Sequence, residues 1–282
     1  MSRTVYVNGS FLPEEDARIS VFDRGFLFAD GVYEVSTVLE GRLIENEAHL
    51  ARLQRSMNEL EMTSPASAKE IVAIQEELIK RNGLIEGALY LQVTRGAADR
   101  DFAFPDKAIP SLVMFTQAKN LINNPAAERG LAVISVEDIR WQRRDIKTVG
   151  LLAPTLAKQA AIAAGADEAW LYEDGFVTEG SSNNAHIITK DGTLVTRNLG
   201  NEILHGITRR SVLQLAQEAD IKVEERPFTL AEAKAAAEAF ITSATTFVLP
   251  VISLDGTSIG SGKPGPLTQR LRQLYIKQAL AS

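Results

Sequence analysis

The spacing of hydrophobic residues divides the chain into short segments in which strand patterns and helix patterns follow one another irregularly. β-branched residues dominate residues 31–38, which predicts a strand, and Glu40-Gly41 then turns the chain into a second strand. Apolar residues recur at helical spacing over residues 50–60, behind Asn46 as a candidate N-cap. Mixed strands and helices without regular βαβ repeats predict an α+β fold.

Caps and turn residues place the other elements. Ser67 opens a helix with a capping box, Gly83 ends it, and Gly165 stops an alanine-rich helix over residues 151–164. Asp23-Arg24-Gly25 is predicted to be a turn. Further strands are expected at residues 5–7, 88–94, 111–116, 131–136, 168–172, 185–188, 194–196, 221–224 and 239–242, and further helices at 207–218, 230–236 and 266–281.

One stretch separates two domains in this prediction. Residues 119–130 are polar, lack periodicity and contain Asn-Asn-Pro, which is typical of a linker. The sequence therefore predicts a small α+β domain over residues 1–118, an interdomain linker over 119–130, and a larger domain over 131–282. A chain of 282 residues is long enough for two such domains, each with its own core.

Composition and charge exclude several classes of function. A net charge of −6 argues against nucleic-acid binding, and the lack of cysteine excludes disulfides, thiolate metal sites and cysteine nucleophiles. The three histidines, His49, His186 and His205, do not have the spacing of a metal site, so we expect no metal. The chain has no long apolar run and no signal peptide, which predicts a cytoplasmic protein that does not bind membranes.

Lys147 is a candidate for covalent chemistry. It stands in a short polar segment just before a predicted helix, and apolar residues follow it. A lysine amine forms a Schiff base only when it is deprotonated, which burial or a neighbouring cation favours. The alternative is a solvated lysine at the end of a strand.

Glu179 follows 32 residues later, at the end of a predicted strand and before Gly180-Ser181-Ser182. A carboxylate beside the ring nitrogen of a pyridine-type cofactor keeps that nitrogen protonated, so that the ring can accept electrons. Otherwise Glu179 is a loop residue before a polar turn, or a helix cap.

Other residues suit the binding of anions. Helix N-termini bind phosphate through free N–H groups, and residues 205–208 and 242–246 both have that form. Arg52 can add a charged contact, and Tyr33 and Arg100 suit a substrate carboxylate. Each has an ordinary alternative, namely a helix cap, a solvated arginine or a ring packed in the core.

In their order, the motifs of the chain resemble those of the fold-type IV enzymes that use pyridoxal 5'-phosphate (PLP), above all the D-amino-acid aminotransferases. The resemblance extends over nearly the whole chain, and Asp-Gly-Val-Tyr-Glu at 30–34 and Thr-Glu-Gly-Ser-Ser at 178–182 are its most specific parts. The other matching motifs lie at residues 23–26, 46–53, 92–96, 138–147 and 206–209.

The resemblance implies a fold of two domains with the cofactor in the cleft between them. Lys147 would hold PLP through a Schiff base and carry the proton between Cα and C4′, and Glu179 would pair with the pyridine nitrogen. Leu204 would pack behind the ring, and Ser182 would support the cofactor. The phosphate would be held by Arg52, by Ile207 and Thr208, and by the backbone of Ala244.

The resemblance also implies a homodimer. Tyr33 would bind the α-carboxylate of the substrate together with Arg100, which would reach in from the second subunit. His49 would lie near the phosphate and contact the residues that bind it.

Two positions depart from the pattern of the best-known members. They carry Arg-x-His in the carboxylate loop, whereas this chain reads Arg100-Asp101-Phe102, so a second carboxylate donor is missing. Threonine often stands at the position of Ala244, so that only the backbone N–H of this residue can serve the phosphate.

The leading functional hypothesis is a transaminase that exchanges an amino group between a D-amino acid, such as D-alanine or D-glutamate, and a 2-oxo acid. The alternatives are a branched-chain L-amino-acid aminotransferase and aminodeoxychorismate lyase. A member of the family that has lost PLP and serves only as an interaction module is a fourth possibility, against which intact Lys147 and Glu179 argue.

Overall fold

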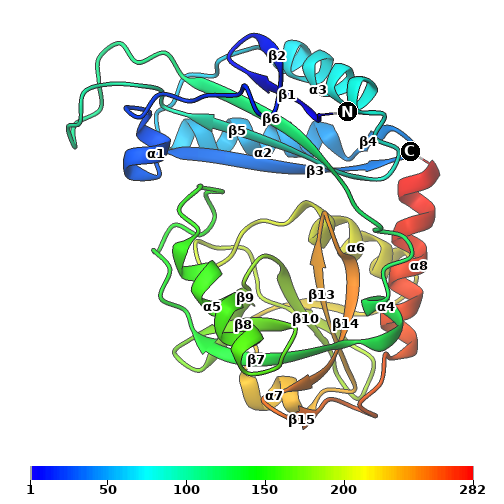
Figure 1. Cartoon of the computed structure of the whole chain (residues 1–282). Helices are drawn as coiled ribbons and strands as arrows, with labels where there is room; N and C mark the ends of the chain where they lie inside the picture. Colours follow the sequence, from blue (N-terminus) through cyan, green and yellow to red (C-terminus); the bar gives the residue numbers. More distant parts are fainter. Residues whose placement is uncertain (1, 282) are drawn as a thin grey trace. The chain divides into compact units, whose positions relative to one another are not determined.

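The computed structural model describes residues 2–281, which form two compact units, each built on one sheet with helices (Figure 1). The first unit contains the chain up to Asn120 together with Ile146–Gly150. The second contains Leu121–Asp145 and the chain from Leu151 onward. The segment predicted to be a linker is not structureless, since it holds the short helix α4 (Ala126–Arg129).

Within the described residues, the first unit is an antiparallel sheet with two long helices and the short helix α1 (Arg24–Phe28). The strands follow the order β2-β1-β6-β5-β3-β4. They are β1 (Thr4–Val7), β2 (Ser10–Pro13), β3 (Gly31–Leu39), β4 (Arg42–Ile44), β5 (Gly87–Thr94) and β6 (Ser111–Ala118), and the two long helices are α2 (Asn46–Glu59) and α3 (Ala68–Asn82). The predicted capping box at Ser67 and the glycine cap at Gly83 are confirmed.

Alternation along β5 assigns the two faces of this sheet. Leu89, Leu91 and Val93 are buried in one core with residues of α2 and α3. Because successive side chains of a strand point to opposite faces, Tyr90 and Gln92 stand on the other face. Both of them are only half-buried.

The second unit is a nine-stranded sheet with helices. Its order is β12-β11-β10-β13-β14-β7-β8-β9, with β15 paired to β14. Trp170 and Phe240 are fully buried in it. The strands are β7 (Leu131–Glu137), β8 (Glu168–Glu173), β9 (Phe176–Gly180), β10 (Asn184–Ile188), β11 (Leu194–Thr196), β12 (Val223–Glu225), β13 (Glu238–Ser243), β14 (Phe247–Leu254) and β15 (Thr257–Ser258). The helices are α4, α5 (Leu152–Ala163), α6 (Ile207–Glu218), α7 (Leu230–Ala235) and α8 (Pro266–Ala281).

Two local predictions in the first unit were wrong. Asn46 is not an N-cap: helix α2 begins at this residue behind Glu45, and the Asn46 side chain instead bonds Ser36 and Gln75. Asp23-Arg24-Gly25 does not form a turn but begins the short helix α1 (Arg24–Phe28), which the Asp23 side chain caps.

Strand β14 was not predicted at all. It pairs with β13 on one side and with β7 on the other, although Pro250 stands in its middle and proline lacks the N–H that a central strand uses. The pairing register with β7 shifts between Val251 and Ser253, just beyond the proline. Pro250 therefore stands inside the sheet, although the sequence pattern assigns a proline to a loop or an edge strand.

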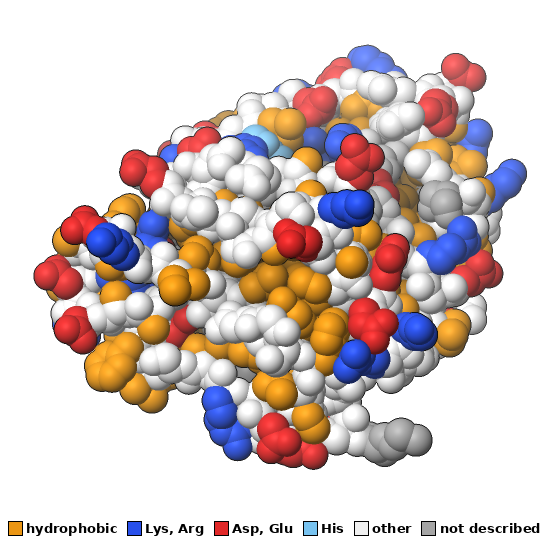
Figure 2. Space-filling model, turned by 90° about the horizontal axis from the view of Figure 1, so that it is seen from above, with side chains coloured by type: hydrophobic (Ala, Val, Ile, Leu, Met, Phe, Trp, Pro, Cys, Tyr) orange, Lys and Arg blue, Asp and Glu red, His pale blue; other side chains and the backbone are white. Residues whose placement is uncertain are grey.

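The surface of the described chain carries both apolar and charged side chains. On the face drawn in Figure 2, hydrophobic side chains gather near the centre, with acidic and basic side chains around them. None of the helices within residues 2–281 has the length and hydrophobicity that crossing a membrane requires.

Candidate active site

Lys147 lies on the edge of β3. The Tyr33 N–H donates to the Lys147 carbonyl, and the Val149 N–H donates to the Gly31 carbonyl, each at 3.0 Å. Strand β4 occupies this edge only from Thr37 onward, which leaves the first half of β3 open for the lysine segment. The Lys147 Nζ is 4.1 Å from the centre of the Tyr33 ring.

A buried charge cluster lies one residue further along β3. Glu34 accepts hydrogen bonds from Arg52 Nε and Nη2 at 2.7 and 2.8 Å, and its Oε2 lies 2.8 Å from His49 Nδ1. Burial by itself raises the pKa of the Glu34 carboxyl, but the charge and hydrogen bonds of Arg52 and His49 outweigh it and lower the pKa to about 2. The cluster holds Arg52 and His49 against β3, and a phosphate contact from Arg52 stays a prediction.

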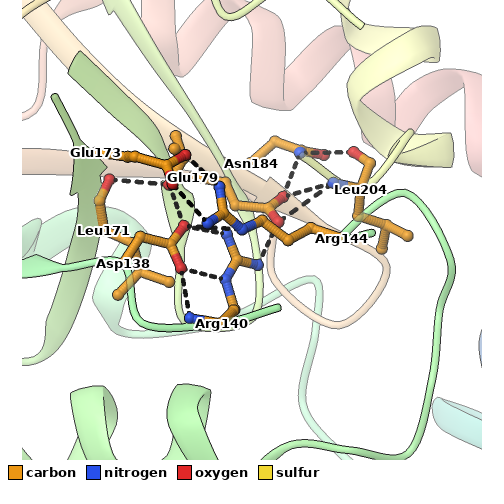
Figure 3. Close-up of polar contacts among 9 residues, drawn as sticks. Asp138, Arg140, Arg144, Leu171, Glu173, Glu179, Asn184 and Leu204 are labelled. Atoms are coloured by element: carbon orange, nitrogen blue, oxygen red, sulfur yellow. Dashed lines mark hydrogen bonds and ion pairs between the residues drawn. The ribbon is translucent and has the colours of Figure 1, made fainter. Parts of the chain in front are cut away.

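Glu179 lies near the end of β9, and every hydrogen bond given to its oxygens comes from an N–H group (Figure 3). The donors are Arg140 Nη1 at 2.5 Å, Asn184 Nδ2 at 2.9 Å, and the Leu204 backbone N–H, which is 3.1 and 3.2 Å from the two oxygens. Burial raises the pKa of Glu179, and the charge of Arg140 opposes that rise. Because all of these partners are hydrogen-bond donors, they favour the anionic form of the carboxyl group.

Arg140 is a site residue whose role the sequence did not reveal. Its guanidinium also bonds both oxygens of Asp138, at 2.7 and 2.9 Å, and Asp138 accepts from the Thr178 hydroxyl at 2.7 Å (Figure 3). Burial lowers the pKa of Arg140, but the two carboxylates more than compensate and raise it. The motif at 138–147 contained this pair, but nothing in it indicated that Arg140 would reach Glu179.

At the start of helix α6, the backbone lies close to the side chain of Asn184. Gly206 precedes the helix and, because it has no side chain, caps none of the first N–H groups. A Cβ at this position would lie 2.0 Å from Asn184 Oδ1, so a larger residue would displace the Asn184 side chain. The Asn184 amide in turn donates to Glu179 and to the Leu204 carbonyl. The predicted residues Leu204, Ile207 and Thr208 therefore lie next to the Glu179 cluster.

Two other predicted cofactor residues stand apart from these hydrogen bonds. Ser182 is exposed in the turn after β9, whereas the neighbouring Ser181 is buried and donates to Glu168. Ala244 is half-buried in the β13–β14 turn, where the hydroxyls of Ser243 and Thr246 lie 2.8 Å apart. Their contacts with a cofactor stay predictions.

The predicted carboxylate loop is shaped by Arg24. Its guanidinium donates to the Asp101 carbonyl at 2.6 Å and to the Ala103 carbonyl at 3.3 Å. Arg100 is exposed, and its guanidinium carbon is 5.2 Å from the centre of the Phe28 ring. The Asp101 side chain accepts from the Ala103 N–H of its own loop at 3.0 Å. The Asp-Arg-Gly motif thus positions the loop that carries Arg100.

Comparisons with known proteins assign the chain to a family. The family model for amino-transferase class IV matches residues 31–254. The chain therefore belongs to the class IV aminotransferases. It is 37% identical to a D-alanine aminotransferase of Staphylococcus epidermidis over 274 residues, which cover 97% of this chain and 96% of that protein. It is 40% identical to a D-alanine aminotransferase of Bacillus licheniformis over 270 residues, with 95% and 94% covered.

A solved structure gives the same fold. The branched-chain amino acid aminotransferase of Thermoproteus uzoniensis with norvaline has a TM-score of 0.88 at 27% identity, covering 100% of this chain and 96% of that one. Another branched-chain enzyme of this fold, 26% identical to this chain, was solved with pyridoxamine 5'-phosphate. The α+β fold and the class inferred from the motifs, a PLP-dependent aminotransferase of the D-amino-acid aminotransferase family, are confirmed. Enzymes of this class act on amino acids and 2-oxo acids.

Proposed function

We propose that this chain transfers the amino group of a D-amino acid, such as D-alanine or D-glutamate, to a 2-oxo acid. Near-full-length identity of 37–40% to D-alanine aminotransferases carries this proposal. The motifs around Tyr33 and Glu179 agree with it. The branched-chain structures, at 26% and 27% identity, are less similar in sequence.

The residues fit PLP at each end of the cofactor. Glu179, surrounded by N–H donors, suits the protonated ring nitrogen. The first N–H groups of α6, to which the N-cap Gly206 offers no side-chain hydrogen bond, suit the phosphate. Arg52 would add its charge to the phosphate, with Ala244 and Ser182 as further contacts. When bound, PLP supplies a ring that accepts the electron pair left as the substrate Cα loses its proton.

Lys147 would perform the proton transfer. Its Nζ takes the proton from the substrate Cα and returns one on the way to product, so one amine acts as base and then as acid. Tyr33, over whose ring the amine lies, would direct the substrate α-carboxylate away from the lysine, with Arg100 as its charged partner.

We further propose that the chain forms a homodimer in the cytoplasm. Arg100 stands on an exposed loop, next to Phe102, whose side chain is 79% exposed. Phe104 and Ile109 of the same segment are also exposed, and exposed apolar side chains that gather in one place mark an interaction surface. This arrangement supports delivery of Arg100 to the site of the second subunit.

Substrate assays test the proposed reaction. We expect D-alanine with 2-oxoglutarate to form pyruvate rapidly. L-leucine with the same acceptor should have a kcat/KM at least about tenfold lower, because a side chain that differs from the preferred one by a single methylene group already lowers kcat/KM by that factor. Aminodeoxychorismate is the third substrate to be offered. Faster turnover of L-leucine, or cleavage of aminodeoxychorismate, would favour the branched-chain or the lyase alternative.

Replacing Glu179 by glutamine is expected to lower kcat by about 10²-fold, as removal of one preorganised electrostatic contact does. The neutral amide cannot keep the ring nitrogen protonated, while Lys147 still binds the cofactor, so the visible absorption of PLP should persist. Steady-state kinetics and absorption spectra provide the measurement. Glu173→Gln is the matched control, because Glu173 is a partly exposed carboxylate that bonds Arg144. Full activity of the Glu179 variant would rule out this role.

A further inference from the structure

The sheet face of the first unit that lies opposite helices α2 and α3 carries a row of aromatic rings. Tyr33, Tyr90 and Phe115 stand on the neighbouring strands β3, β5 and β6. Their rings are stacked, with centres 5.5 Å apart for the first pair and 4.6 Å for the second. Since Lys147 Nζ lies over the Tyr33 ring, the row begins at the proposed reactive amine and leads away from it across the sheet.

Gln92 adds a polar group to this row. It is the cross-strand partner of Tyr33, so both side chains stand on the same face about 5 Å apart at their Cβ atoms. The Tyr90 hydroxyl donates to Gln92 Oε1 at 2.7 Å. Burial, with a smaller effect of Tyr33, raises the pKa of Tyr90, so this hydroxyl stays protonated and keeps donating.

The bond from Tyr90 decides what Gln92 offers to a substrate. An amide has one acceptor oxygen and an NH2 group with two donors. Tyr90 engages the oxygen, and within residues 2–281 the structure gives the Nε2 group no acceptor. The half-buried side chain therefore presents two N–H donors on the face that holds Tyr33 and Lys147.

We propose that Gln92, oriented by Tyr90, binds the distal carboxylate of a dicarboxylic substrate, such as 2-oxoglutarate or D-glutamate. This inference rests on the proposed function, in which Tyr33 and Arg100 hold the α-carboxylate and leave the second carboxylate to Gln92. The amide is neutral, so it accepts a carboxylate through hydrogen bonds and still admits a small substrate such as pyruvate. Gln92 is thus a specificity residue, and Tyr90 is its positioning residue.

The test compares two acceptors that differ only in the second carboxyl group: 2-oxoglutarate and 2-oxopentanoate, each with D-alanine as donor. We expect Gln92→Leu to raise KM for 2-oxoglutarate by about 10- to 100-fold, the loss expected for hydrogen bonds to a charged group. KM for 2-oxopentanoate and kcat for both acceptors should be unchanged. Tyr90→Phe, which keeps the ring and removes the hydroxyl, should raise KM in the same selective way but by a smaller factor.

Gln117→Leu is the matched control, because Gln117 is an exposed glutamine on β6 two residues beyond Phe115. It should change neither KM.

An equal rise of KM for both acceptors in the Gln92 variant would overturn the inference, because it would assign Gln92 to the α-carboxylate. Unchanged KM for both would overturn it as well. If Gln92→Leu does not fold, Tyr90→Phe decides by the same comparison. A wild-type enzyme that uses neither acceptor with D-alanine would instead refute the proposed function, before any variant is made.

Discussion

Replacing Lys147 by alanine is expected to abolish transamination and to remove the visible absorption band of bound PLP. In the proposed function, the lysine amine both holds the cofactor and moves the proton at Cα. Loss of the proton transfer alone lowers kcat by up to about 10⁴-fold. The fold should persist, because the segment is held through its backbone bonds to β3 and not through the lysine side chain. Initial rates and absorption spectra of the purified variant are the measurements.

Two further variants separate the chemistry of this amine from its charge. Lys147→Arg keeps a cation over the Tyr33 ring but cannot form a Schiff base, so we expect it to be as inactive as the alanine variant. Lys190→Ala, at an exposed lysine in the β10–β11 turn, should be fully active. An active, yellow Lys147→Ala enzyme would show that another residue holds the cofactor.

Replacing Glu34 by glutamine is expected to destabilise the first unit by about 3–5 kcal/mol, the usual cost of removing one partner from a buried ion pair. The substitution leaves the buried guanidinium of Arg52 without its carboxylate and removes the acceptor of His49. The lowering of the Glu34 pKa from 4.5 to about 2 leads to a similar value, about 3 kcal/mol. Urea unfolding of both proteins measures the difference.

The same cluster predicts how the difference depends on pH. Because the pKa of Glu34 is lower in the folded protein than in the unfolded chain, its stabilising effect is complete above pH 4.5 and is lost as the pH falls toward 2. The gap in unfolding free energy between wild type and Glu34→Gln should therefore narrow in acid. Glu40→Gln, at an exposed carboxylate paired with Arg42, should stay within about 0.5 kcal/mol of wild type. A gap that stays constant down to pH 2 would contradict the lowered pKa.

Elements with strong local signals were predictable from the sequence. Helix α3 has a capping box at one end and a glycine cap at the other, and α6 and α8 have the predicted bounds. The failures occurred where distant residues decide. Asparagine is a common helix cap, but the side chain of Asn46 is hydrogen-bonded to Ser36 and Gln75 instead. Strand β14 exists despite Pro250, because β13 and β7 supply partners on both sides.

The order of the motifs by itself determined the family, the PLP chemistry and the identities of Lys147 and Glu179 as candidates. Only the tertiary structure decided that the lysine segment returns to the edge of β3, beside Tyr33, and that Arg140 pairs with Glu179. Local propensity depends on a few neighbouring residues, so it predicts single elements well. Which strand edge is free, and which carboxylate an arginine reaches, depend on residues far apart in the chain, which only the folded protein brings together.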